Sequence, residues 1–327
     1  MQRGLVRLTV ATGAVGLLLW FDFVDLEVLR DVLERPGPVV AAVVLLLATV
    51  PLAAYRWWLL LHRLDLTLGY MLLLRTTFVG QFCNTFLPGA YGGDLVRATL
   101  AYREARAGLS RITFSLVADR LSGLVALLFL GLMMLPAFPG DYRQVVIVAV
   151  LVAVCVIVAG VATGLRYGER AAGWLGSRSG RFLRRVAGFL VEIVGSLRSY
   201  LENWRLMAGA VLLSIIQFVL VLSALTLVGR AMEFDLLSVW GYLVAGVWAL
   251  VANALPLTPG GVGIGEAAFA EIAEFIESAP SGASYATAFL AHRMLVALVS
   301  LVGLVPFRTS EPGDLEELLT IRSSEEA

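Results

Sequence analysis

Two stretches of this chain place glycines and prolines directly before an acidic residue. The first is NTFLPGAYGGDLVRA at residues 84–98, and the second is NALPLTPGGVGIGEAA at residues 253–268. Glycine and proline interrupt helices, and the acids Asp94 and Glu266 follow the two interruptions. A helix that starts after such a break directs its positive end and its free N–H groups toward the break. Both stretches therefore predict a place where an anionic group can bind.

An arginine lies within the apolar run that follows each stretch. Arg120 belongs to SRITFSLVADRLSGLVALLFLGLMML, and Arg293 is near the middle of SYATAFLAHRMLVALVSLVGLVP. At the centre of a membrane helix an arginine costs roughly 2.5–3.5 kcal/mol on the insertion scale, and it normally faces a bundle interior or an aqueous cavity. Arg120 could pair with Asp94, and Arg293 with Glu266, to hold each half together. We expect these arginines also to contact a phosphate or another anionic head group, for which a guanidinium fork is well suited.

The matching residues keep their order and nearly their spacing, which indicates an internal duplication. Asn84 corresponds to Asn253, Pro88 to Pro259, Gly93 to Gly265, Asp94 to Glu266 and Arg120 to Arg293. The candidate substrate-binding residues are Asn84, Pro88, Gly89, Gly92, Gly93, Asp94, Arg97 and Arg120 in the first half, and Asn253, Pro259, Gly260, Gly261, Gly263, Gly265, Glu266 and Arg293 in the second. Supporting polar residues are Asp119, Gln217 and His292.

Purely structural roles are open for several of these residues. An acid in the first turn of a helix is a good cap, which could be the whole role of Asp94 or Glu266. Arg97 could contact a head group or could anchor the chain at the cytoplasmic surface. Gln217 is expected to form hydrogen bonds between helices. His292 is the one candidate nucleophile, but a lone histidine in a span is more often a polar neighbour.

The elements that position these residues are membrane helices. Hydrophobic residues make up 59% of the chain and charged residues 15%, against roughly 25% charged in soluble domains. Several apolar runs approach the ~20 residues that a spanning helix needs, and none alternates with period two. The sequence therefore predicts an all-α integral membrane protein with about eight hydrophobic segments, at 5–21, 38–61, 68–87, 110–135, 144–165, 205–228, 236–258 and 284–306.

The charges of the loops predict two re-entrant hairpins. Arginines dominate 94–111, which indicates the cytoplasmic side, whereas 266–283 contains four glutamates and no basic residue, which indicates the outside. The segment that contains each glycine–proline stretch then starts and ends on the same side of the membrane. A hairpin that enters the bilayer, breaks at the stretch and returns would do this. The alternative is a short loop that violates the charge rule. Inverted repeats with broken helices are the architecture of many transporters.

The predicted organisation is one polytopic domain at residues 1–307. It contains repeat one at about 68–135, a cytoplasmic amphipathic linker at 166–204 and repeat two at about 236–306, followed by an acidic cytoplasmic tail at 308–327. Two arginines precede the first apolar run and no small-residue cleavage site follows it, so a retained first helix is expected rather than a signal peptide. Both termini are expected to be cytoplasmic. The two cysteines are far apart, and neither a disulfide nor a metal site is expected.

Four short motifs resemble a known family. NTFLPGAYGGDLVRA, ADRLSGL, PGGVGIGEAAF and AHRML are similar to the flippase-type membrane domain of lysylphosphatidylglycerol synthases and its stand-alone relatives, over about residues 5–307. The resemblance implies movement of lipids or lipid-linked sugars between leaflets, with a head-group site that involves Asp94, Arg97, Arg120, Glu266 and Arg293. The soluble aminoacyl-transferring domain is expected to be absent, so the protein should not make aminoacylated lipid itself. Asp94 departs from the pattern, because the family has Glu there.

Together these features predict a membrane lipid translocase, not an enzyme, in the cell membrane. The expected substrate is a lipid with an anionic or phosphate-containing head, such as a polyprenyl-phosphate-linked lipid or a phospholipid. Lipids are the expected partners, together with lipid-modifying enzymes or glycosyltransferases, and neither nucleic acid nor a cofactor is expected. No G-x-x-x-x-G-K-[ST] stretch occurs, so ATP is not the expected driver. A secondary transporter of a small anion and an intramembrane lipid-phosphate enzyme are the alternatives.

Overall fold

The computed structural model describes residues 35–86, 92–105, 108–137, 140–176, 181–232, 237–253, 263–277 and 282–309. Every regular element within these ranges is a helix, so the all-α prediction is confirmed. The α-helices are α3 (Pro36–Arg63), α4 (Tyr70–Phe86), α5 (Gly92–Ala105), α6 (Leu109–Met133), α7 (Gly140–Gly176), α8 (Arg181–Glu202), α9 (Trp204–Ala231), α10 (Val239–Asn253), α11 (Ile264–Glu277), α12 (Gly282–Ser300) and α13 (Leu304–Thr309). The predicted segment 5–21 and most of the tail lie outside the described residues.

Four stretches in the described part of the chain are long and apolar enough to cross a membrane. They are Pro36–Arg63, Leu109–Met133, Trp204–Ala231 and Tyr285–Pro306. By contrast, α4 has 17 residues and α10 has 15 residues. At 1.5 Å per residue these two helices are about 26 and 22 Å long, shorter than the ~30 Å hydrocarbon core. The lengths of α4 and α10 therefore suit helices that enter the bilayer without crossing it.

Local sequence explains where several helices begin and end. Pro36 occupies the start of α3, where its missing N–H costs no hydrogen bond. Beyond Leu64 the chain turns through Asp65, whose φ of 57° is in the left-handed region. At the start of α9 the side chain of Asn203 accepts a hydrogen bond from the backbone N–H of Leu206 at 3.2 Å, as a helix N-cap does.

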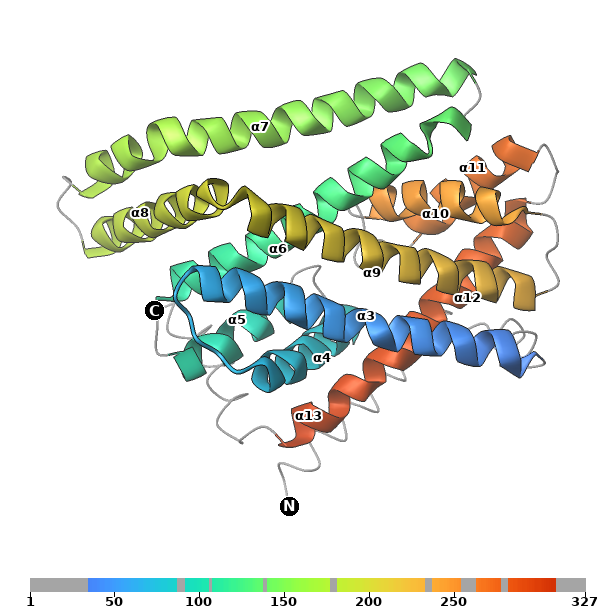
Figure 1. Cartoon of the computed structure of the whole chain (residues 1–327), viewed down its shortest axis with the longest axis horizontal. Helices are drawn as coiled ribbons and strands as arrows, with labels where there is room; N and C mark the ends of the chain where they lie inside the picture. The colour runs from blue at the N-terminus through green and yellow to red at the C-terminus, as the bar shows by residue number, and fades with distance from the viewer. Residues whose placement is uncertain are drawn as a thin grey trace.

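The long helices α3 and α9 pack side by side along the longest dimension of the molecule (Figure 1). Small and branched residues of α3, α9 and α12 form one buried cluster, which includes Ala42, Leu46, Ala224, Val228 and Ala291. A second cluster joins the end of α3 to α4, α5, α6 and α8. These clusters fix the helices from which the charged side chains described below extend.

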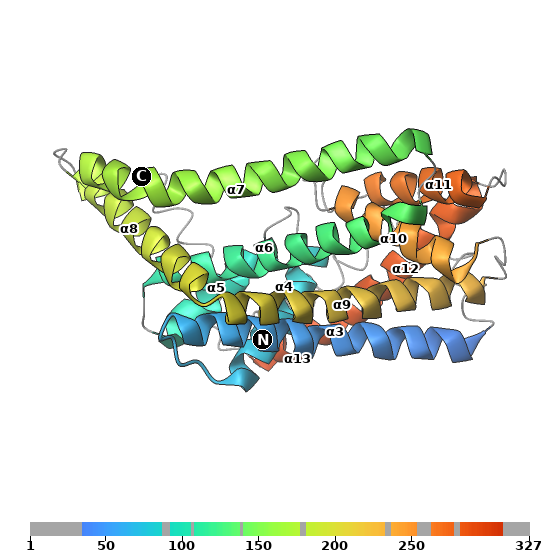
Figure 2. The same ribbon diagram turned by 45° about the horizontal axis from the view of Figure 1, so that its top comes forward.

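The two short helix pairs lie toward opposite ends of this scaffold. Contacts join α4 to α5 and α10 to α11, and both views place the first pair toward the end where α3 finishes and the second pair toward the other end (Figures 1 and 2). The paired helices α7 and α8 pack together along one side, and α8 also contacts α6 and α9.

The outward-facing surface of the long helices is apolar. Large hydrophobic side chains are exposed along α7 at Val148, Leu151, Val152 and Val158, and along α9 at Leu212, Ile216 and Val219. Contiguous apolar surface of this kind is rare on soluble monomers. It fits contact with lipid chains, in agreement with the hydropathy of these segments.

Candidate functional site

In the first half, Asn84 and Gly93 hold α4 close to α5. The side-chain oxygen of Asn84 accepts a hydrogen bond from the backbone N–H of Gly93 at 2.9 Å. A Cβ atom at position 93 would collide with the backbone carbonyl oxygen of Gly80 on α4. Only glycine therefore allows the start of α5 to approach α4 this closely, and the approach positions the next residue, Asp94.

Asp94 and Arg120 form the ion pair that the repeat pattern suggests. Arg120 on α6 lies 2.6 Å (Nη2) and 2.7 Å (Nε) from Oδ2 of Asp94 on the first turn of α5. The side chain of Asp94 is 14% exposed, whereas that of Arg120 is 51% exposed. Arg120 is thus less enclosed than its place in an apolar run indicated, because Asp94 draws its guanidinium group toward the start of α5.

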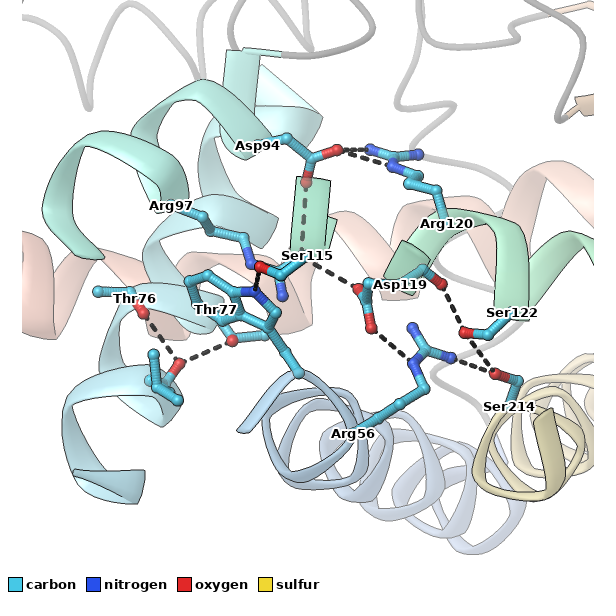
Figure 3. A network of polar contacts seen from close by, with 12 residues as sticks. Arg56, Thr76, Thr77, Asp94, Arg97, Ser115, Asp119, Arg120, Ser122 and Ser214 are labelled. Atoms are coloured by element: carbon cyan, nitrogen blue, oxygen red, sulfur yellow. Dashed lines mark hydrogen bonds and ion pairs between the residues drawn. The ribbon is translucent and has the colours of Figure 1, made fainter. Parts of the chain in front are cut away.

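Asp119, the neighbour of Arg120, occupies the buried centre of the network (Figure 3). Its Oδ1 lies 2.6 Å from Nε of Arg56 on α3, and the two side chains are 6% and 9% exposed. Nη1 of Arg56 also donates to Ser214 at 2.5 Å and to Gln217 at 3.3 Å on α9. The sequence analysis missed Arg56; its position within the apolar run 38–61 was a signal, but it indicated no partner.

Arg97 lies between the two acids and is only 8% exposed. Its Nη1 is 3.4 Å from Oδ1 of Asp94 and 3.5 Å from Oδ2 of Asp119. The centre of its guanidinium group lies 4.3 Å from the ring centroid of Trp57, and Nε1 of Trp57 donates to Ser115 at 2.9 Å. Arg97 is thus enclosed by neighbouring helices, and the choice between a head-group contact and a surface anchor stays a prediction.

The second half contains the matching pair, Glu266 and Arg293. Nε of Arg293 on α12 lies 2.9 Å from Oε1 of Glu266 on the first turn of α11, and the side chains are 17% and 12% exposed. Nη2 of Arg293 donates to Asn253 at the end of α10 at 2.9 Å. The other carboxylate oxygen of Glu266 accepts from the backbone N–H of Gly263 at 2.9 Å, so the helix-cap role of this acid is also present. Gly263 has a φ of 83°, a conformation that favours glycine.

The remaining candidates fall into four cases. Gln217 joins the first-half network through Arg56, as an interhelical hydrogen-bonding residue was expected to do. His292 is 4% exposed, and its Nε2 is buried without a hydrogen-bond partner in the described part of the protein. Gly92 and Gly265 lie at the starts of α5 and α11. Pro88, Gly89, Pro259, Gly260 and Gly261 lie outside the described residues.

The charges of the two halves differ. In the first half the contacts join three guanidinium groups (Arg56, Arg97 and Arg120) to two carboxylates (Asp94 and Asp119), which leaves one excess positive charge when all are ionised. In the second half one guanidinium group meets one carboxylate. Charged residues within membrane helices are costly, and they mark functional sites.

The fold and these buried charges define a class: an all-α integral membrane protein with ionic clusters between its helices. The sequence pattern of the lysylphosphatidylglycerol synthase transmembrane region matches residues 4–303, and the chain belongs to this family. It is also similar to a UPF0104 membrane protein of Methanothermobacter thermautotrophicus, with 23% identity over 273 residues that cover 78% of this chain and 80% of the relative. No solved structure matches the chain.

Proposed function

We propose that this protein is a lipid translocase that moves a lipid with an anionic or phosphate-containing head between the two leaflets. Membership of the lysylphosphatidylglycerol synthase transmembrane family supports a lipid-related function in the membrane. A polyprenyl-phosphate-linked lipid or a phospholipid is the expected substrate class.

The observation that carries this proposal is the repetition of one chemical unit in both halves. In each half an acid on the first turn of a short helix pairs with an arginine on the next long helix, as Asp94 does with Arg120 and Glu266 with Arg293. Each unit follows a glycine–proline stretch, and the start of each short helix supplies N–H groups and a positive dipole end. An anionic head can exchange with the carboxylate at such a unit.

The helix lengths support alternating access. The short helices α4 and α10 precede the two breaks, and the pairs α4–α5 and α10–α11 lie toward opposite ends of the molecule (Figure 1). Two hairpins that enter from opposite leaflets would bring their charged units toward the middle of the bilayer, as in transporters built from inverted repeats. Rocking of the two halves would then open the site to one leaflet at a time.

Reconstitution into liposomes that contain a fluorescently labelled phosphatidylglycerol tests this proposal. A membrane-impermeant quencher measures the rate at which labelled lipid reaches the outer leaflet. Arg120→Ala, Arg293→Ala and Glu266→Gln are expected to slow this rate about tenfold or more, equivalent to a barrier increase of about 1.4 kcal/mol. Arg198→Ala is the matched control, because the side chain of Arg198 on α8 is 55% exposed and pairs with the exposed Glu169.

Equal rates for the wild type and the three site variants would contradict the site. Uptake of a small anion without movement of lipid would instead favour a secondary transporter. Formation of a dephosphorylated product from a polyprenyl diphosphate would favour an intramembrane enzyme. Rates that do not change with pH or membrane potential would exclude protonation of Glu266 as the energy source.

A further inference from the structure

Arg97 differs from the other arginines of the first-half network in how it is paired. Arg56 and Arg120 each lie 2.6 Å from a carboxylate oxygen. The closest carboxylate oxygens to Arg97 are 3.4 and 3.5 Å from its Nη1, which is longer than the 2.7–2.9 Å of a strong charge-assisted hydrogen bond. The acids of the network therefore satisfy Arg56 and Arg120 and leave Arg97 weakly paired.

Among the described residues, one edge of the weakly paired guanidinium group has no partners. Nε and Nη2 of Arg97 are both buried, and neither has a hydrogen-bond partner among the residues that the structure describes. One face of the group lies over Trp57, and Nη1 faces Asp94 and Asp119. The edge formed by Nε and Nη2 is thus the part of the guanidinium group whose hydrogen-bonding capacity the described residues leave unused.

This edge has the geometry of a fork. The N–H bonds at Nε and Nη2 of an arginine are nearly parallel, and together they match two oxygens of a single phosphate or carboxylate group. A lysine ammonium group supplies charge but cannot reproduce this arrangement. Buried donors without partners destabilise a protein, and more so when they are charged, so a site that keeps two of them calls for an explanation.

The charge of the surroundings favours an anion at this edge. Three arginines and two aspartates leave one excess positive charge, and an entering oxyanion would neutralise it. Two further contacts preorganise Arg97. Its aliphatic part lies against Gly80 of α4, and a Cβ atom at position 80 would come within 2.7 Å of Cγ and Cδ of Arg97. The hydrogen bond to Ser115 fixes the ring of Trp57, on which the guanidinium group lies. A preorganised donor loses little conformational entropy when its ligand binds.

We propose that Nε and Nη2 of Arg97 form a bidentate subsite for a phosphate-type oxyanion with two terminal oxygens. The inference deepens the proposed function and rests on it, because it names the atoms that recognise the anionic head of the transported lipid. Arg56 holds Asp119 in place, whereas Arg97 supplies the two parallel N–H groups that contact the head group.

Equilibrium binding to the purified full-length protein in maltoside detergent, which contains no phosphate, tests this assignment. The probes are dioctanoyl phosphatidic acid, inorganic phosphate and uncharged dioctanoylglycerol, each titrated calorimetrically. Arg97→Lys is expected to weaken binding of phosphatidic acid about tenfold or more, although the charge is kept. Arg103→Lys, at an exposed position of the same helix, is the matched control and is expected to bind as the wild type does.

The probes also distinguish the source of the oxyanion. Binding of both phosphatidic acid and inorganic phosphate with the same dependence on Arg97 indicates recognition of the phosphate group itself. Binding of phosphatidic acid alone indicates that the fork acts only on a lipid head group. Both results support the fork. Equal affinity of the wild type and Arg97→Lys would overturn it.

A wild-type measurement keeps the test decisive if Arg97→Lys does not fold. A fork recognises an oxyanion, so the wild type is expected to bind dioctanoyl phosphatidic acid about tenfold or more tightly than uncharged dioctanoylglycerol; equal affinity for the two would overturn the assignment. The two proposals can also fail separately. Arg97-dependent binding without lipid movement in liposomes would refute the translocase and keep the fork, whereas lipid movement with Arg97-independent binding would refute only the fork.

Discussion

Replacing the buried Asp119 by Asn should destabilise the protein more than the loss of a charge on its surface. Asp119 is 6% exposed and faces both Arg56 and Arg97. Without its carboxylate, the first-half network would hold three guanidinium groups and one carboxylate, so its excess charge would rise from one to two. Removing one partner of a buried ion pair costs about 3–5 kcal/mol, because the other partner is left charged and uncompensated.

The exposed pair between Arg198 and Glu169 provides the matched comparison. Nη2 of Arg198 lies 3.2 Å from Oε1 of Glu169, and the two side chains are 55% and 59% exposed. Solvent screens such a pair, so Glu169→Gln is expected to cost only about 0–1 kcal/mol. Equilibrium unfolding in mixed micelles of maltoside and dodecyl sulfate, followed by circular dichroism, measures both variants under the same conditions.

A double variant separates charge from packing. Arg56→Gln combined with Asp119→Asn returns the network to two guanidinium groups and one carboxylate, with the original excess charge of one. The double variant should therefore be less destabilised than the sum of the two single variants. The electrostatic reasoning is wrong if the two effects simply add, or if Asp119→Asn costs no more than Glu169→Gln.

Two further substitutions test the packing that positions the site. Gly93→Ala should lower the thermal unfolding temperature and slow lipid movement, because its Cβ would collide with the backbone of Gly80. Gly209→Ala on α9 is the control. A Cβ there has no neighbour within 4 Å, so the unfolding temperature and the rate of lipid movement should stay unchanged. Tyr200→Phe should cost about 1 kcal/mol in the same unfolding assay, because it removes the buried hydrogen bond at 2.9 Å to the backbone carbonyl of Leu60 that ties α8 to α3. An unchanged unfolding curve for Tyr200→Phe would contradict that role.

The acid–arginine pairs could be predicted because a charge in an apolar run is conspicuous and has few possible partners. Order along the chain matched Asp94 with Arg120 and Glu266 with Arg293, and both pairs are present. The hydropathy of the sequence likewise located the long helices, since the length of an apolar run directly reflects the thickness of the bilayer.

The centre of the first-half network could not be predicted in the same way. Arg56 lies in an apolar run seven residues before Arg63, and no residue of the repeat pattern corresponds to it or indicates its partner. Its buried position depends on the packing of α3 against α6 and α9, which places Asp119, Ser214 and Gln217 around it. Partners so distant in sequence become neighbours only through tertiary structure.

The angle between adjacent helical residues does not keep them out of one network. Asp119 and Arg120 point about 100° apart on α6, so they face different neighbours. They nevertheless belong to one network, because Arg97 reaches Asp119 while Asp94 reaches both Arg97 and Arg120. Long side chains from a neighbouring helix can therefore connect two faces of α6.

The unequal charges of the two halves place a condition on how any anion could cross the protein. An anion that binds beside Arg97 reduces the excess charge of the first half. An anion that enters the second half in this conformation adds uncompensated negative charge, because Arg293 is already paired with Glu266 and bonded to Asn253. The two halves cannot bind one anion equally well while Arg293 is paired with an ionised Glu266. Transfer from the first half to the second therefore requires the second ion pair to open or Glu266 to become neutral.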